Sequence, residues 1–242
     1  MPRSWQQLVP PVIKDAVHTG SACLRLLRQE GSPAPLFTWI RKVGPVSRRA
    51  SLLSEARRLQ LYRLALLVAR NRVPGDVVEC GVAGGGSAVV LGASGLLDVE
   101  DRDLWLFDSF QGLPAPGERD GPRSMRLQGE CAADQEDVAA VLREAGVPPK
   151  KTHLVGGWFA ATFPESRIYR VCFLHIDADW YDSVKLCLDR FYDRLSRGAV
   201  VVLDDYDDWP GCRSALEDFQ RERNLRFDIV RHGAGAAYFQ VP

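Results

Sequence analysis

Two apolar segments of the chain end in carboxylates whose charges repel one another. Asp177 follows the apolar part of LHIDADWY (174–181), and Asp204 and Asp205 follow that of VLDDYDDW (202–209). Such repulsion is tolerated when a cation lies between the acids. Oxygen-only ligands favour Mg²⁺, Ca²⁺ or Mn²⁺ over zinc. We therefore predict that Asp177, Asp204 and Asp205 bind one divalent ion, Mg²⁺ or a similar cation. The alternative is a set of acids that only cap surface turns.

A glycine-rich turn lies in DVVECGVAGGGS (76–87), directly after an apolar segment. Its four glycines let a ligand approach backbone N–H groups at the start of a helix. The spacing is not the dinucleotide pattern G-x-G-x-x-G, because Ala83 takes the second glycine position, and it is not a P-loop, because no lysine precedes Ser87. Asp108 ends the next apolar segment, where an acid can accept hydrogen bonds from ribose hydroxyls. The turn and Asp108 together predict a site for a cofactor that carries a ribose.

The elements that must position these residues follow from an alternation of apolar and amphipathic segments. Strands are predicted at 76–81, 103–108, 152–157, 170–177 and 198–205. Helices are predicted at about 51–73, 134–145, 182–196 and 213–224, and a strand pair around Gly233 and Gly235 ends the chain. Near-continuous apolar strands separated by helices indicate a parallel sheet covered on both faces. Ligands bind such sheets at the carboxyl ends of the strands, where all the candidate acids lie.

Composition narrows the class of protein further. The 242 residues carry 31 basic and 31 acidic side chains, so no net field favours nucleic acid. Six cysteines without a CxxC pair indicate a reduced, cytoplasmic protein without a zinc site. No apolar segment approaches the roughly 20 residues that a membrane span needs.

The first quarter of the chain is less regular. Residues 1–50 are expected to be irregular, with a short helix at 24–27 and a linker or mobile arm at 31–47. A solvated helix face is the simplest interpretation of its basic residues, which are Arg41, Lys42, Arg48, Arg49, Arg57 and Arg58.

Several motifs, taken together and in order, resemble one family. They are SLLSEARRLQL, GDVVECGVAGGGS, LFDSFQGLP, GGWFAATFP, LHIDADWYDS and VVLDDYDDWPGCRSAL. In order and spacing they resemble the TylF/macrocin O-methyltransferases, over about residues 50–242. Members of that family methylate sugar or related hydroxyls on natural products. One departure is at Ala83 and Gly84, where the family commonly has a bulky and then a basic residue.

The resemblance implies an α/β, Rossmann-like class I methyltransferase fold with a mostly parallel seven-stranded sheet and helices on both faces. An N-terminal helical arm or lid (1–50) would precede the S-adenosylmethionine-dependent methyltransferase domain (51–242) and often carries a subunit interface, so a homo-oligomer is expected. S-adenosylmethionine would be the methyl donor, Mg²⁺ the metal and a small-molecule hydroxyl the acceptor. Asp177, Asp204 and Asp205 would match the metal ligands. The residues expected to bind the cofactor are Glu79, Gly81, Ala83, Ser87, Asp108 and Ser109.

The same resemblance makes Asp177 the expected general base, with Asp179 and His175 as rivals. Trp180 stands where catechol-type methyltransferases place a lysine base, so a lysine mechanism is not expected. Two other functions stay open at this point. Asp177-Ala178-Asp179 also matches the DxD metal motif of glycosyltransferases, and a scaffold that binds S-adenosylmethionine without catalysis is the non-enzymatic alternative.

Overall fold

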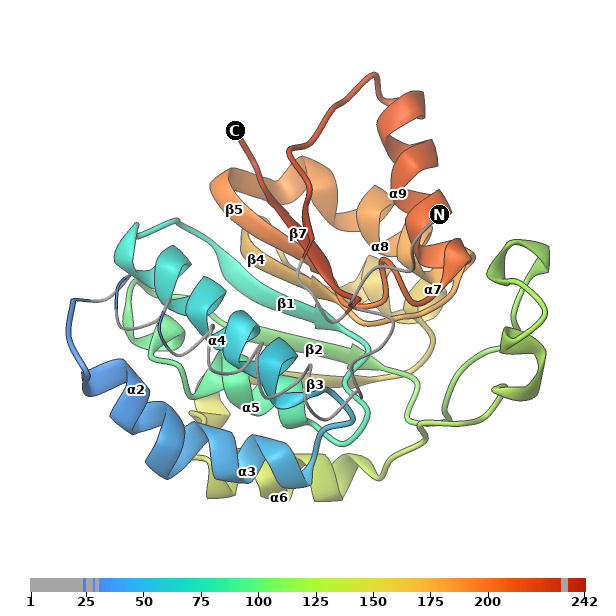
Figure 1. Cartoon of the computed structure of the whole chain (residues 1–242). Helices are drawn as coiled ribbons and strands as arrows, with labels where there is room; N and C mark the ends of the chain where they lie inside the picture. Colours follow the sequence, from blue (N-terminus) through green and yellow to red (C-terminus); the bar gives the residue numbers. More distant parts are fainter. Residues whose placement is uncertain (1–23, 25–27, 29–30, 232–234) are drawn as a thin grey trace, which may run out of the picture.

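A single seven-stranded sheet organises the computed structural model, which describes residues 24, 28, 31–231 and 235–242 (Figure 1). The strand order is β3-β2-β1-β4-β5-β7-β6. The first five strands are mutually parallel: β1 (Asp76–Cys80), β2 (Leu104–Asp108), β3 (Thr152–Gly156), β4 (Val171–Ile176) and β5 (Leu195–Leu203). The last two run antiparallel to their neighbours, β6 (Val230–Arg231) and β7 (Ala237–Gln240). The predicted mostly parallel sheet and terminal strand pair are confirmed; Gly233 lies outside the described residues.

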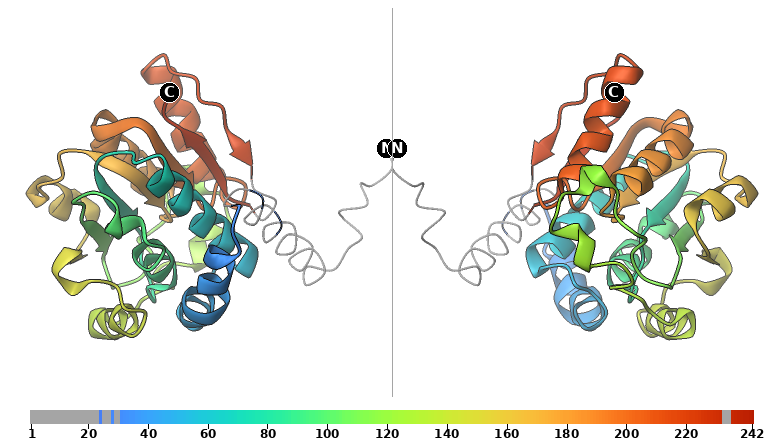
Figure 2. Two further views of the ribbon diagram at one scale, coloured as in Figure 1. Left: turned by 90° about the vertical axis from the view of Figure 1, so that its left-hand side faces the viewer. Right: turned by 90° about the vertical axis from the view of Figure 1, so that its right-hand side faces the viewer.

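Helices cover both faces of the sheet (Figures 1 and 2). One layer contains α4 (Glu55–Arg70), α5 (Gly86–Gly92) and α6 (Gln135–Glu144). The other contains α7 (Phe159–Thr162), α8 (Tyr181–Phe191) and α9 (Pro210–Glu222). Successive strand residues face opposite layers: Val77 belongs to the first core cluster and Val78 to the second. Burial on both faces explains why the central strand β4 is almost continuously apolar.

Helix boundaries follow local capping chemistry. Asp134 caps α6, as predicted, by accepting a hydrogen bond from the Glu136 N–H at 2.7 Å. The last helix begins at Pro210, three residues before the predicted start, because proline is well suited to the first helical position. The helix predicted at 182–196 ends at Phe191, and β5 begins at Leu195, three residues before the strand predicted at 198–205. Gly198 therefore lies inside β5, with φ 82°. Between Val171 and Phe173 the β4–β5 register shifts, so the residues around Gly198 form a bulge in a longer strand.

The prediction of a linker or mobile arm at 31–47 is wrong. This segment forms α2 (Ala34–Thr38), a π-helical turn (Trp39–Val43) and α3 (Gly44–Arg49). Trp39 is 2% exposed and its ring centroid lies 5.3 Å from that of Tyr62 on α4. Pro35 and Pro45 each lie within the first two positions of a helix, where proline favours the helix instead of breaking it. The predicted helix at 24–27 falls almost wholly outside the described residues.

The basic residues of the first quarter divide into two groups. Arg41, Lys42, Arg48 and Arg49 are exposed, as predicted. The prediction of a solvated face is wrong for Arg58, which is 3% exposed and donates to the Ser47 hydroxyl at 3.0 Å. It is also wrong for Arg57, whose side chain is 13% exposed. Among the described residues, no helix has both the length and the apolar character to cross a membrane.

Candidate active site

A cavity of about 510 Å³ opens at the carboxyl ends of the parallel strands. Its walls include the glycine turn, the segment 50–53 before α4, the loop 111–130 and the acids after β4 and β5. Eight of the predicted site residues line it: Gly81, Ala83, Ser87, Asp108, Ser109, Asp177, Asp204 and Asp205. The predicted cofactor-binding residues and metal ligands therefore share one cavity, with Glu79 as the exception described below.

Gly81 joins the cofactor side of the cavity to the acid side. Its φ is 90°, and a Cβ at this position would lie 1.8 Å from the carbonyl oxygen of Asp177. The Asp177 N–H in turn donates to the Cys80 carbonyl at 2.9 Å. No side chain fits at Gly81, because the backbone of the first metal candidate passes directly over it.

Gly86 serves packing as well as any ligand. Its N–H donates to the Ala50 carbonyl at 3.0 Å, and an added Cβ would lie 2.2 Å from the Cβ of Ser51. A Cβ on Gly84 would lie 2.7 Å from the Ala50 carbonyl oxygen. The sequence interpretation treated these glycines as access for a ligand; they also admit the segment that follows α3.

Asp108 supports the glycine turn from the neighbouring strand. One carboxylate oxygen accepts hydrogen bonds from the Val82 N–H at 2.7 Å and the Ala83 N–H at 2.8 Å. The other accepts from the Phe110 N–H at 2.7 Å. An ionised carboxylate offers about four acceptor positions. Asp108 therefore fixes the turn and keeps room for about one further donor, fewer than the two ribose hydroxyls that the sequence suggested.

Asp177, Asp204 and Asp205 each place one carboxylate oxygen within 4.8 Å of the others. Adjacent parallel strands bring them together: Asp204 N–H donates to the Ile176 carbonyl at 3.0 Å. Burial and the neighbouring carboxylates raise the pKa of Asp177 and of Asp205 well above the usual range. The Oδ2 of Asp205 is buried and has no hydrogen-bond partner. A buried oxygen without a partner, among excess negative charge, is the environment that a hard cation stabilises.

Asp204 differs from its two neighbours. Burial alone would raise its pKa, but His175 and the Arg57 guanidinium together lower it below the usual value. Arg57 Nη1 lies 2.6 Å from Asp204 Oδ2. Burial lowers the pKa of Arg57, yet Asp204 and Asp208 outweigh it and raise the pKa above its ordinary value. Asp204 is therefore held ionised by the protein itself.

Glu79 and His175 form a buried pair below the acids. Both side chains are 0% exposed, and His175 Nδ1 lies 2.9 Å from Glu79 Oε1. The other ring nitrogen, Nε2, is 4.0 Å from Asp204 Oδ1. Burial lowers the pKa of His175, but the two acids outweigh it and raise the value to about 10. Glu79 is not among the residues that line the cavity, and His175 is a sheet residue behind Asp204.

The chain resembles known proteins in both sequence and fold. Residues 44–241 match the profile described as macrocin-O-methyltransferase (TylF). The chain belongs to this family. It is 33% identical over 178 residues to demethyldecarbamoylnovobiocin O-methyltransferase of Streptomyces niveus, covering 70% of this chain and 67% of that protein. It is 32% identical over 181 residues to mycinamicin III 3''-O-methyltransferase of Micromonospora griseorubida, covering 71% and 70%.

Solved structures agree with the family assignment. The O-methyltransferase NovP superposes with a TM-score of 0.72 at 28% identity, covering 79% of this chain and 82% of that one. A Bacillus cereus O-methyltransferase in complex with SAH has a TM-score of 0.50 at 14% identity, covering 76% and 80%, and shows the shared fold alone. The TylF-family chain is thus an S-adenosylmethionine-dependent O-methyltransferase with the class I methyltransferase fold.

One residue of the TylF-family site, Asp120, was not found by sequence reasoning. Asp120, which is 1% exposed, accepts from the Tyr181 N–H and the Gly117 N–H, both at 2.7 Å. Trp180 Nε1 donates to the Pro114 carbonyl at 2.9 Å. These bonds attach the loop 111–130 to the start of α8. Nothing in the spacing of Asp120 distinguishes it from ordinary loop residues.

Asp179 lies between the metal candidates and the loop. It lines the cavity and has a left-handed backbone with φ 53°, which is uncommon for a residue other than glycine. Burial, and then the charge of Asp204, raise its pKa to about 6. Its position keeps it among the possible proton acceptors for a hydroxyl in the cavity.

Proposed function

We propose that the enzyme methylates a hydroxyl on a sugar or related group of a natural product and uses a divalent metal ion. The observation that carries the proposal is the shared cavity, in which the glycine turn and Asp108 face three clustered carboxylates. The relatives support the acceptor class, since their names include demethyldecarbamoylnovobiocin, mycinamicin III and a rhamnosyl tetracenomycin.

The chemistry of the cluster supports the metal. All three candidate ligands, Asp177, Asp204 and Asp205, offer hard oxygen atoms, as Mg²⁺ prefers. The buried Oδ2 of Asp205 lacks a partner that a cation would supply. A bound divalent ion would act as a Lewis acid that makes the acceptor hydroxyl more acidic.

The protein residues would then supply position and proton transfer. Gly81, Ala83, Ser87, Asp108 and Ser109 would hold the methyl donor on one side of the cavity. Asp177 would orient the acceptor hydroxyl and accept its proton, with Asp179 as the rival base. The oxygen would attack the methyl carbon directly, the methyl–sulfur bond would break, and S-adenosylhomocysteine would leave. Positioning of the two reactants would provide most of the acceleration.

The position of Glu79 changes its proposed role. Because it is buried against His175, it would support His175 and Asp204 instead of contacting the cofactor directly. The residues flanking metal ligands commonly orient them in this way.

Family membership supports methyl transfer over the DxD glycosyltransferase alternative. The named O-methyltransferase relatives and the complete acid cluster likewise favour an active enzyme over a scaffold without catalysis. Cytoplasmic location and a homo-oligomer stay predictions. The free thiols at Cys80, Cys131, Cys172, Cys187 and Cys212 are compatible with a reducing compartment.

The test is Mn²⁺ binding followed by electron paramagnetic resonance, with methyl transfer to a panel of glycosides measured in Mg²⁺ or in EDTA. Asp205→Asn should weaken Mn²⁺ binding by at least about 100-fold, because it removes a proposed ligand, and leave S-adenosylhomocysteine binding unchanged. Asp101→Asn, at a fully exposed side chain, is the matched control. Turnover that is equal in EDTA and Mg²⁺ would reject the metal role. No turnover with any glycoside would leave the acceptor class unsupported.

A further inference from the structure

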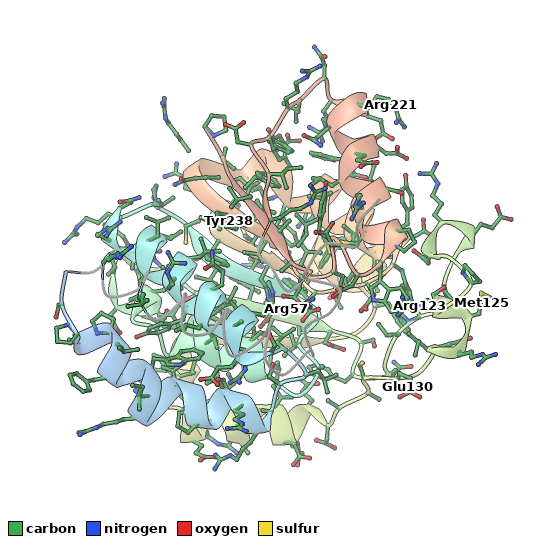
Figure 3. All side chains as sticks on the ribbon, in the orientation of Figure 1. Arg57, Arg123, Met125, Glu130, Arg221 and Tyr238 are labelled. Atoms are coloured by element: carbon green, nitrogen blue, oxygen red, sulfur yellow. The ribbon has the colours of Figure 1, made fainter. Side chains whose placement is uncertain are left out.

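The guanidinium of Arg57 forms an ion pair with Asp204, one of the proposed metal ligands. Arg57 lies in the first turn of α4, beside the carboxyl ends of the strands (Figure 3). Its Nη1 is 2.6 Å from Asp204 Oδ2, and its Nη2 binds Asp208 Oδ2. The side chains of Arg57 and Asp204 are 13% and 4% exposed, so water screens this pair weakly.

We propose that Arg57 is the internal counter-ion of the acid cluster. Arg57 would share Asp204 with the divalent ion, and its positive charge would lower the affinity of the cluster for that ion. When no metal is bound, the guanidinium compensates part of the buried negative charge. The part concerning metal affinity rests on the metal site of the proposed function; the part concerning the metal-free protein does not.

The guanidinium is confined by the C-terminal segment. Gly235 has φ 100°, and a Cβ there would lie 2.2 Å from Arg57 Nη2 and 2.5 Å from Asp208 Oδ1. The Asp207 N–H donates to the Gly235 carbonyl at 2.8 Å, which holds this segment over the ion pair. Arg57 is therefore packed between α4, the turn after β5 and the segment before β7, and it stays near Asp204 when a metal ion arrives.

Two opposing effects decide the result of removing the charge. Loss of a residue that orients a metal ligand typically weakens metal binding by about 10- to 100-fold. A unit charge roughly 6 Å from a divalent ion at an effective dielectric constant of about 20 repels it by more than this, by a factor of well over 100. The second effect is the larger, so a neutral residue at position 57 should tighten metal binding.

The first experiment measures Mn²⁺ affinity by electron paramagnetic resonance in wild type, Arg57→Gln, Arg57→Lys and Arg70→Gln. Arg70 lies in the last turn of the same helix and controls for the change in net charge. We expect the Kd of Arg57→Gln to fall at least about tenfold, and those of the other two to stay within about threefold of wild type. A Kd for Arg57→Gln that is unchanged or higher would overturn the shared-ligand proposal and make Arg57 a structural residue.

The second experiment concerns the metal-free protein. In EDTA, Arg57→Gln should lower the unfolding temperature by about 5 °C or more, because it leaves Asp204 buried without its partner. If the two residues compensate each other, the double variant Arg57→Gln/Asp204→Asn should be no less stable than Arg57→Gln alone. Additive losses would overturn the counter-ion role. Absence of Mn²⁺ binding in wild type would reject the metal site itself, and this cycle would still decide the role of Arg57.

Discussion

Asp204 and Asp205 are consecutive in the chain, yet their surroundings give them opposite electrostatic properties. Arg57 and His175 lower the pKa of Asp204, whereas burial and nearby carboxylates raise that of Asp205. Asp204 therefore has cationic partners within the protein, whereas the buried Asp205 Oδ2 has no hydrogen-bond partner. Two adjacent residues of the same type therefore contribute differently to one anionic site.

Asp218 on α9, an acid outside the cluster of Asp177, Asp204 and Asp205, provides a pH-dependent test. It accepts hydrogen bonds from Arg119, first in importance, and from Tyr181 and Arg221, which lower its pKa to about 2. Because the folded-state pKa lies below the unfolded value, the stabilisation is complete above about pH 4 and is lost as the pH falls through about 2.

We therefore expect the difference in free energy of unfolding between wild type and Asp218→Asn to be constant above about pH 4 and to vanish near pH 2. The difference should be small, because solvent screens Arg119. Urea unfolding at several pH values measures it. A difference that persists unchanged at pH 2 would show that the lowered pKa is not its source.

The acids of the site could be predicted from sequence, because parallel strands must end at a common edge and an acid at each end must meet its neighbours. Arg57 could not be predicted in the same way. Its residue type and helical spacing match those of exposed arginines such as Arg49, and only the tertiary position of α4 buries it. Glu79 shows the reverse case, in which a motif position indicated a ligand contact and strand pairing with His175 buried it instead.

At the scale of elements, the loop 111–130 is a wall of the cavity that is attached to α8 through Asp120 and to α9 through Arg119. Figure 1 shows it projecting from the body of the molecule, and Met125 lies on its outer part (Figure 3). Asp120 accepts from the N–H of Tyr181, the first residue of α8, and the N-cap residue Trp180 supplies no side-chain hydrogen bond to that helix. Asp120 of the loop therefore caps the N-terminus of α8.

Asp120→Ala should destabilise the protein by about 2–4 kcal/mol, because it leaves the Tyr181 and Gly117 N–H groups without their acceptor. It should also raise KM for the acceptor about tenfold and leave S-adenosylhomocysteine binding unchanged. Glu118→Ala, at an exposed position of the same loop, is the control. Chemical denaturation and steady-state kinetics measure the two effects. An equal loss of cofactor affinity would indicate general unfolding instead of a displaced loop.

Element types were predictable where the period of apolar residues was clear, as in β1, β4 and α6. Element boundaries were harder to predict where the same residue type is common in two kinds of structure. Gly198 resembles a helix stop, but tertiary pairing with β4 makes it a bulge within β5. The proline-containing segment 31–47 resembles a linker, and the burial of Trp39 and Val43 makes it helical.

At the scale of the whole molecule, the N-terminal helices belong to the support of the active site. Trp39 and Val43 join the core cluster on the α4 face, and the segment after α3 contacts Gly86 in the glycine turn. A division of the chain at residue 50 would separate these contacts from the site that they support.

Trp39→Ala should cost about 3–5 kcal/mol of stability, because it empties a buried site of indole size. It should also weaken S-adenosylhomocysteine binding, since α3 and the glycine turn lose their support. Phe37→Ala, two residues away at a side chain that is 55% exposed, should change stability by less than about 0.5 kcal/mol. Urea unfolding and calorimetry measure the pair. Unchanged affinity in Trp39→Ala would separate the arm from the cofactor site.

The contact of Gly81 with the carbonyl oxygen of Asp177 has a consequence for redesign of the enzyme. Under the proposed function, this main-chain contact would fix the separation between the donor side and the acid side of the cavity, and side-chain substitutions elsewhere would leave it in place. By contrast, we expect the loop 111–130, which lines the same cavity, to contribute to acceptor preference. We therefore expect that exchanging this loop between relatives, with the Asp120 and Pro114 attachments retained, changes the accepted substrate. The distance between the methyl donor and the acceptor hydroxyl should stay the same.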